Sequence, residues 1–300
     1  MRAVLIALVV LLAGGCGRGA RDAVVLYTSQ DQFYAEPILR EFMLSTGIEV
    51  RSVFDTESVK TAGLANRLRQ EASNPRCDVF WSNEEMHARM LAGEGVFPAD
   101  SIRTVGYRTR RLVVNTNLMP LARAPRQLMD LTNSEWKGKI ALAYPLYGTT
   151  GSQFLALRRL WGQEAWTRWC EGLVANDAKV VDGNSVVVKL VGAGEAWIGL
   201  TDSDDVAAGR RNGLPVEQAP MTDELLVIPN TLCVVRNREA PEVARLVEFL
   251  SNEAAVDRLV AAGALEGSEI PSEGLKMNWN GLRAELDEAL AELKRIFLRT

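Results

Sequence analysis

Residues 24–54 read VVLYTSQDQFYAEPILREFMLSTGIEVRSVF, and this stretch decides the fold. Its first five residues are typical of a buried parallel strand, because apolar side chains follow one another without polar alternation. Helical spacing of apolar residues follows, and Gly47 ends the predicted helix. Residues 48–54 then supply a second strand. The stretch is therefore a strand, helix and strand unit of the kind that builds α/β proteins.

The same pattern continues along the chain. Ser58 is a candidate N-cap for a helix to about residue 72, and CDVFW at 77–81 predicts a third strand. Further strands are expected at 140–143, 180–181, 196–200 and 231–235, and further helices at 154–160, 185–191, 241–250, 252–262 and 282–298. Strands that alternate with helices in this way predict doubly wound sheets.

The order of these elements predicts an α/β fold with two doubly wound lobes and two hinge crossings between them. We expect lobe 1 to comprise residues 22–113 plus 234–300, and lobe 2 to comprise residues 114–233. The amphipathic C-terminal helix is expected to dock against lobe 1, because its polar face mixes both signs of charge.

The composition excludes several classes of function. The 300 residues are 47% hydrophobic and 24% charged, which suits a globular chain of about two domains. The 34 basic and 38 acidic residues give a net charge of −4 without a basic stripe, so we expect no nucleic acid partner. The single histidine, His87, weakens hydrolase and zinc-site interpretations, and we expect it at the surface.

Residues 1–15 have the short charged start, apolar run and small residues of a signal peptide. Cys16 follows directly, as in a bacterial lipobox, which predicts lipidation of its thiol and a membrane anchor. A plain secretory signal peptide with an incidental cysteine is the alternative, and either predicts a periplasmic or cell-surface protein. For Cys77, Cys170 and Cys233, one disulfide plus one thiol or three buried thiols both fit.

Several segments together resemble a known family. They are VVLYTSQDQFYAEPILREFMLSTGIEV, CDVFWSNE, RRLVVNTN, EWKGKIALAYP with GTTGS, DGNSVVVKLVGAGEAWIGLTDSDD and PNTLCVV. The chain is similar to the bacterial extracellular solute-binding proteins of the ferric-ion-binding type, which deliver ligands to ABC importers. The resemblance implies a type II periplasmic-binding clamshell that holds its ligand between the lobes without catalysis. It also implies a permease and an ATPase as partners.

The resemblance implies Fe³⁺ as the ligand, although the residues that hold iron in the family differ here. Members usually place two tyrosines after the strand that matches residues 196–200, where this chain reads TDSDD. Some members have a histidine at the position of Asp31 and a glutamate near Glu84. Fe³⁺ prefers anionic oxygen donors, which carboxylates supply. The candidate metal ligands are Asp31, Glu84, Asp202, Asp204, Asp205 and Tyr144, with Tyr27, Tyr34 and Tyr147 as further phenolate donors.

An alternative for the acidic run is a helix N-terminus, with Asp202 or Ser203 as N-cap and two aspartates in the first turn. The segment GTTGS at 148–152 also opens a helix, whose free N–H groups favour an anion such as the carbonate or phosphate that accompanies iron in the family. The alternative is that this segment is only a helix cap and turn, without a bound anion. The candidate anion-binding residues are Ser29, Ser82, Thr149, Thr150, Gly151, Ser152 and Ser185.

Two other functions remain open at the level of sequence. A cleft lined by hydroxyl groups and helix N-termini also suits a small organophosphate or phosphonate. An exported metal-dependent phosphatase that uses the acidic run is more distant, because the chain has no nucleophile elbow, no GxxxxGK[ST] and no HExxH. We therefore expect a binding protein rather than an enzyme.

Overall fold

A computed structural model describes residues 23–55, 62–146, 148–220, 224, 226–277 and 282–298. Its strands are β1 (Ala23–Thr28), β2 (Glu49–Phe54), β3 (Val79–Ser82), β4 (Arg103–Asn115), β5 (Ile140–Ala143), β6 (Lys179–Val181), β7 (Ile198–Asp202), β8 (Val216–Gln218) and β9 (Val227–Val234). Its α-helices are α1 (Gln32–Thr46), α2 (Ala62–Gln70), α3 (Met86–Gly93), α4 (Gly148–Trp161), α5 (Gln163–Ala175), α6 (Asn184–Gly192), α7 (Ser203–Arg211), α8 (Pro241–Leu250), α9 (Glu253–Ala261) and α10 (Leu282–Phe297). The predicted signal peptide and Cys16 lie outside the described residues.

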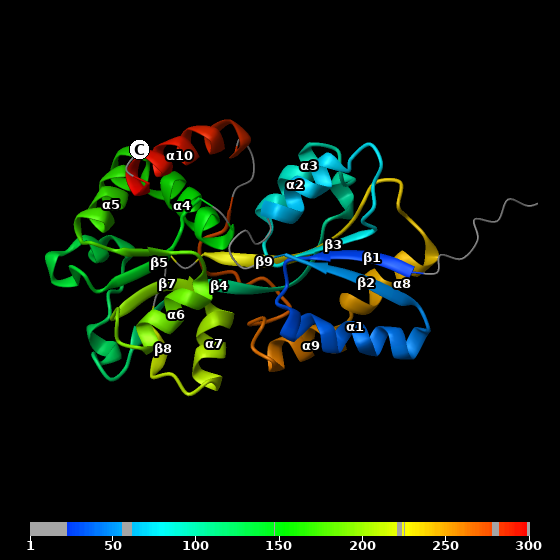
Figure 1. Cartoon of the computed structure of the whole chain (residues 1–300). Helices are drawn as coiled ribbons and strands as arrows, with labels where there is room; N and C mark the ends of the chain where they lie inside the picture. The colour runs from blue at the N-terminus through cyan, green and yellow to red at the C-terminus, as the bar shows by residue number, and fades with distance from the viewer. Residues whose placement is uncertain are drawn as a thin grey trace, which may run out of the picture.

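The strands form one path in the order β2-β1-β3-β9-β4-β7-β5-β6, and β8 pairs with β4. Pairing is parallel within β2-β1-β3 and within β7-β5-β6, and antiparallel where β9 and β4 join these two groups. Figure 1 shows the two groups side by side, each with helices on both faces. The expected α/β fold with two doubly wound lobes and two crossings is confirmed.

The crossings are made by the two longest strands of the path. The first part of β4 pairs with β9 as far as Thr109, and from Arg110 onward β4 pairs with β7 in the other lobe. A bulge interrupts the β4–β9 pairing between Thr104 and Tyr107. Gly106 lies in this bulge with φ of 89°, and a Cβ there would lie 2.7 Å from the carbonyl oxygen of Gly267. Only glycine fits this left-handed position at the crossing. The predicted lobe boundaries stay a prediction.

Each lobe has an apolar cluster on either face of its sheet. In lobe 1, one cluster joins β1 and β3 to α1, α8 and α9, and another packs α2 and α3 on the opposite face. In lobe 2, α6 and α7 cover one face, while α4 and α5 cover the other with Phe154, Trp166 and Trp169 at its centre. The sheet edge formed by strand C-termini is left for polar residues.

The C-terminal helix α10 packs on lobe 2, so the expectation that it docks against lobe 1 is wrong. Its apolar stripe, which includes Leu286 and Leu293, belongs to the same cluster as Phe154 and Trp169. The Phe297 ring meets Phe154 edge to face at 5.9 Å, and Arg158 pairs with Glu288 at 2.8 Å. The physical reason is that α4 and α5 leave an apolar surface that matches the stripe. The chain therefore crosses between the lobes a third time, from lobe 1 back to lobe 2.

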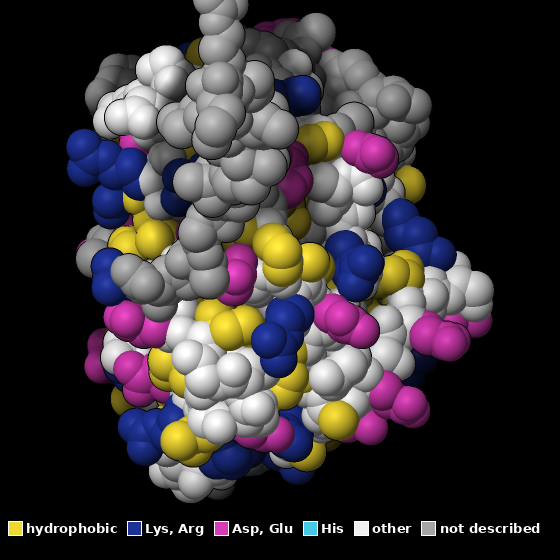
Figure 2. Space-filling view, turned by 90° about the vertical axis from the view of Figure 1, so that its right-hand side faces the viewer, with side chains coloured by type: hydrophobic (Ala, Val, Ile, Leu, Met, Phe, Trp, Pro, Cys, Tyr) yellow, Lys and Arg dark blue, Asp and Glu magenta, His cyan; other side chains and the backbone are white. Residues whose placement is uncertain are grey.

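Cys77, Cys170 and Cys233 are all buried free thiols, which confirms the second of the two cysteine alternatives. Within the described ranges, none of the helices has the length and apolar character needed to cross a membrane. On the face in Figure 2, acidic and basic side chains are interspersed with hydrophobic ones over the surface.

Candidate functional site

Polar residues gather where the strands of both lobes end and the chain crosses between them. From lobe 1, β1 is followed by Ser29 and Asp31 and β3 by Asn83 and Glu84; from lobe 2, β7 ends at Asp202. In open α/β sheets this edge is the usual place for a ligand. The structure therefore places these sequence-predicted residues directly after the C-terminal ends of their strands.

The three aspartates of the TDSDD segment form the most compact acidic group in the described part of the chain. Each of Asp202, Asp204 and Asp205 can offer one carboxylate oxygen, and these atoms lie within 4.8 Å of one another. Asp202 holds the N-cap position of α7, but its side chain makes no capping hydrogen bond. Its carboxylate is instead directed at β4. The alternative of a helix N-terminus, with Asp202 as N-cap and two aspartates in the first turn, is confirmed, although the cap is made without a side-chain hydrogen bond.

Two buried arginines on β4, which the sequence analysis did not identify, neutralise part of this acidic group. Arg108 and Arg110 are two residues apart on a strand and so share one face; they are 4% and 0% exposed. Arg110 Nη1 lies 2.6 Å from Asp202 Oδ1, and Arg108 Nη2 lies 3.3 Å from Asp202 Oδ2. Arg108 also pairs with Asp204. The signal in the sequence was the RTRR segment at 108–111, with arginines alternating along an expected crossing strand.

The pKa shifts follow from this arrangement. Burial opposes ionisation of Asp202, but the guanidinium groups of Arg110 and Arg108 outweigh it and lower the pKa of Asp202. Burial also opposes the charge on Arg108, while the carboxylates of Asp204 and Asp202 raise its pKa above the ordinary value. Asp205 and Asp31 act in the same direction on Arg108. Asp31 therefore approaches the lobe 2 cluster from lobe 1.

The predicted anion-binding residues of lobe 2 lie beside the same cluster. Thr149 donates its hydroxyl to Asp202 Oδ2 at 2.7 Å, and Thr150 donates to Asn184 Oδ1 at 3.2 Å. The Arg110 guanidinium reaches Thr149, Asn184 and, through Nε, Gln153 Oε1 at 2.9 Å. The first turns of α4 and α6 thus meet around Arg110. Gly151 and Ser152 lie in the first turn of α4, and Ser185 in the first turn of α6.

The lobe 1 residues are held mainly by each other. Ser29 donates to Asn83 Oδ1 at 3.0 Å, and Ser82 Oγ accepts a hydrogen bond from the Glu84 N–H at 3.4 Å. The Glu84 carboxylate accepts hydrogen bonds from the backbone N–H groups of Met86 and His87, and it lies 2.7 Å from His87 Nδ1. Glu84 thereby satisfies the start of α3. His87 is buried, at 8% exposure, so the expectation of a surface histidine is wrong.

The described tyrosines have different surroundings. Tyr27 donates its hydroxyl to Glu71 at 3.0 Å, and burial together with this bond raises the pKa of Tyr27 to about 12. Tyr144 is half-buried directly after β5. Tyr34 accepts a hydrogen bond from Arg211, and Tyr147 lies outside the described residues. Among the described tyrosines, Tyr34 is close enough to the cluster for Asp204 and Asp31, in addition to burial, to raise its pKa.

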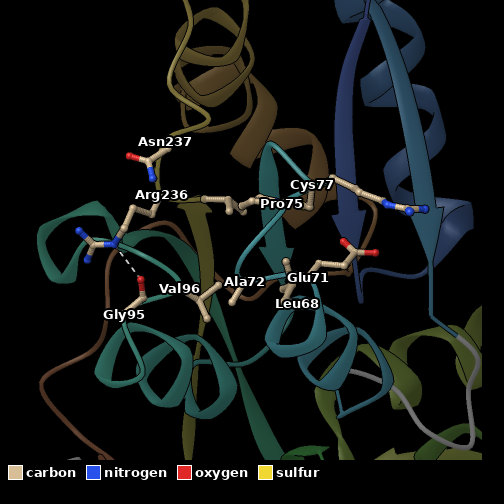
Figure 3. Close-up of a pocket in the computed structure, with 11 residues that line it drawn as sticks. Leu68, Glu71, Ala72, Pro75, Cys77, Gly95, Val96, Arg236 and Asn237 are labelled. Carbon is tan, nitrogen blue, oxygen red and sulfur yellow. Dashed lines mark hydrogen bonds between the residues drawn. The ribbon is translucent and has the colours of Figure 1, made fainter.

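A small cavity at the other end of β3 is separate from this site. It has a volume of about 40 Å³ and lies beside Glu71, Cys77 and Val96 (Figure 3). Arg236 closes one side by donating from Nε to the Gly95 carbonyl at 2.8 Å. This volume has room for only a few water molecules.

The two lobes, with polar residues at the strand ends where they meet, define a two-lobed binding protein of the periplasmic type. The sequence profile of the bacterial extracellular solute-binding proteins matches residues 24–264, and the chain belongs to this family. Iron-bound HitA from Pseudomonas aeruginosa has the same fold, with a TM-score of 0.80, 22% identity and coverage of 92% of this chain and 100% of that one. The expected family resemblance is confirmed.

Two further proteins are similar. The Fe(3+)-binding periplasmic protein of Serratia marcescens is 29% identical over 217 residues, or 66% of this chain, and the match spans about three fifths of that relative (62%). AfuA from Actinobacillus pleuropneumoniae, solved with fructose-6-phosphate bound, has a TM-score of 0.75 and 16% identity, covering 93% of this chain and 99% of its own.

Proposed function

We propose that this protein captures ferric iron, together with a small anion, in the cleft between its lobes and delivers it to an ABC importer. The observation that carries the proposal is the charge of the cluster. Asp204 and Asp202 pair with Arg108, Asp205 and Asp31 also act on it electrostatically, and Arg110 is the second guanidinium. Four carboxylates against two guanidinium groups leave two negative charges at the mouth of the cleft, which favours a cation.

The acidic residues divide into two roles. Asp202 is saturated by Arg110, Arg108, Thr149 and Asn184, so we assign it to the scaffold. Asp204 and Asp205 at the start of α7 and Asp31 at the start of α1 supply the oxygen donors from both lobes, and Tyr144 is a further candidate. Hard anionic oxygens are the donors that Fe³⁺ prefers.

The anion is assigned to the lobe 2 side of the cluster. The N-termini of α4 and α6 provide backbone N–H groups and positive helix-dipole ends, and Arg108 provides a fixed positive charge next to Asp204. A carbonate or phosphate there would complete the coordination of the ion.

The proposal includes the cellular setting of the protein. An exported chain, anchored through a lipid on Cys16 and facing a permease and an ATPase, would release its ligand at the membrane. Closure of the lobes would trap the ligand by hinge motion at β4 and β9. The protein would perform no reaction on the ligand.

Metal content and binding measurements test the proposal. Chelator-treated protein is titrated with ferric citrate, and bound iron is counted by elemental analysis alongside the thermal midpoint. We expect about one iron per chain and a raised midpoint. Asp205→Asn should weaken binding about tenfold or more, or ~1.4 kcal/mol. The matched control is Asp287→Asn on the exposed face of α10. Wild-type protein that retains no iron and shows no shift would contradict the proposal.

A second candidate is a phosphorylated organic solute, favoured by one specific observation. The Nη2 atom of Arg110 is buried and has no hydrogen-bond partner among the described residues. A phosphate oxygen between the starts of α4 and α6 would satisfy it, and AfuA shows that this fold accommodates a sugar phosphate. A thermal shift with fructose-6-phosphate, but not with fructose or ferric citrate, would favour this candidate over iron.

A further inference from the structure

Helix α7 connects the candidate ligand site to a contact between the lobes. Its first turn carries Asp204 and Asp205, and its last residue is Arg211. Nine helical residues span about 13 Å, and a helix of this length behaves as a rigid rod. A displacement of the site end therefore displaces Arg211 as well.

Arg211 reaches across to two helices of lobe 1. Its Nη1 donates to the Ala262 carbonyl oxygen at 2.6 Å, and its Nη2 donates to the Tyr34 hydroxyl at 2.5 Å. The guanidinium carbon also lies 5.6 Å from the centroid of the Tyr34 ring. Figure 1 shows α7 on the side of lobe 2 that faces α9 and α1. One side chain thus joins lobe 2 to the end of α9 and to the first turn of α1.

The lobe 1 side of this contact is shaped for a guanidinium. Ala262 is the C-cap of α9, where carbonyl groups carry the negative end of the helix dipole. Gly263 has φ of 77°, and a Cβ there would lie 2.7 Å from Arg211 Nη1. Tyr34 is only 7% exposed, and burial raises its pKa, so the phenol remains a neutral acceptor. The Ala262 carbonyl and the Tyr34 hydroxyl are fixed acceptors, and Gly263 has no side chain. The space between them therefore fits the Arg211 guanidinium.

We propose that Arg211 is a positioning residue that stabilises the closed arrangement of the lobes and thereby slows release of a solute held at the start of α7. The inference rests on the solute-binding function of the family and not on iron as the solute. When the lobes separate, Arg211 must leave both acceptors. Its contacts therefore hold the lobes in the arrangement that this structure shows.

Small-angle X-ray scattering of the full chain tests the proposal, with and without excess ferric citrate. A compact chain of 300 residues has a radius of gyration of about 19 Å. Arg211→Gln should give a larger radius than wild type in at least one condition, and Tyr34→Phe should shift it in the same direction by a smaller amount. The matched control is Arg210→Gln, because Arg210 lies on the same turn but pairs with Glu217 inside lobe 2 at 3.2 Å.

Release kinetics provide a second measurement. Transfer of bound iron to an excess of chelator should be about fivefold faster for Arg211→Gln than for wild type or Arg210→Gln, the equivalent of ~1 kcal/mol. If Arg211→Gln and wild type scatter identically in both conditions, the proposal is overturned. If they differ while ferric citrate affects neither, the role of Arg211 stands and iron is the wrong solute. Circular dichroism confirms that each variant is folded.

Discussion

Asp202 and Asp205 lie three residues apart and have the same side chain, yet their different surroundings give them different roles. Asp202 is 1% exposed and is shared between two guanidinium groups, a hydroxyl and an amide. Asp205 is half-buried in the first turn of α7. A buried carboxylate that accepts from four donors contributes to the scaffold, whereas a ligand can reach one that is partly accessible.

Asp202→Asn should therefore destabilise the protein strongly. The substitution leaves Arg110 buried without its counter-charge, which typically costs about 3–5 kcal/mol. Urea denaturation at pH 7 measures the free energy of unfolding. Asp287→Asn, an exposed control on α10, should change it by less than about 0.5 kcal/mol. An unfolding free energy for Asp202→Asn equal to that of the control would disprove the scaffold role.

The lowered pKa of Asp202 also predicts a dependence of stability on pH. Its folded pKa lies below the unfolded value of about 3.9, so its stabilisation is complete above that pH and is lost as the pH falls through the folded value. Wild-type stability should decline below about pH 4. Unfolding curves between pH 5 and pH 3 should show a steeper decline for wild type than for Asp202→Asn, and parallel curves would rule this out.

At this scale the sequence predicted the acidic and hydroxyl residues of the site because they follow strands, and strand ends meet at one edge of a sheet. It did not predict Arg108 and Arg110. Their strand continues through both lobes, so its register, and with it the face that the arginines share, depends on pairing with β7 and β9. The contacts of Glu84 with Met86 and His87 are local and do not depend on this register.

Among the elements, α10 shows what a periodic pattern can and cannot predict. Its apolar spacing correctly indicated an amphipathic helix near residues 282–298. The spacing does not specify which surface the helix packs against, because any apolar groove of the right width can bury its apolar stripe. The choice of lobe 2 follows from the exposed face of α4 and α5 and from charge pairs such as Arg159 with Glu285 at 3.0 Å.

Leu293→Ala in α10 should lower the free energy of unfolding by about 2–5 kcal/mol, because Leu293 is fully buried in the lobe 2 cluster and its removal leaves a cavity. Leu298→Ala is the matched control, since Leu298 is 41% exposed just after the helix. Denaturant unfolding of both variants checks the difference. Equal values would mean that α10 is not docked on α4 and α5 in solution.

For the molecule as a whole, the length of the chain and its strand–helix alternation were enough to predict two lobes. The third passage between the lobes was not predictable, because it depends on where α10 binds. Residues of this passage run beside a crossing strand, as the Val227 N–H donates to the Leu275 carbonyl oxygen at 2.9 Å. The hinge region is therefore wider than two strands.

The buried thiols of Cys77, Cys170 and Cys233 can be used to measure how well both lobes are packed. Burial raises the pKa of Cys233 to about 12 and also raises those of Cys77 and Cys170, so little reactive thiolate is available at pH 8. We expect no alkylation of these three residues in native protein and complete alkylation in urea. Peptide mapping by mass spectrometry follows each cysteine separately. Rapid labelling of Cys170 alone would indicate that lobe 2 opens independently.

The return of the chain to lobe 2 has a consequence for anyone who wishes to produce that lobe by itself. A fragment made of residues 114–233 would lack α10 and would present Phe154, Trp169 and their neighbours to solvent. Such a fragment should aggregate during expression. A circularly permuted gene that fuses residues 282–298 to the fragment restores the covering helix, and this is the version that should yield a soluble half-molecule.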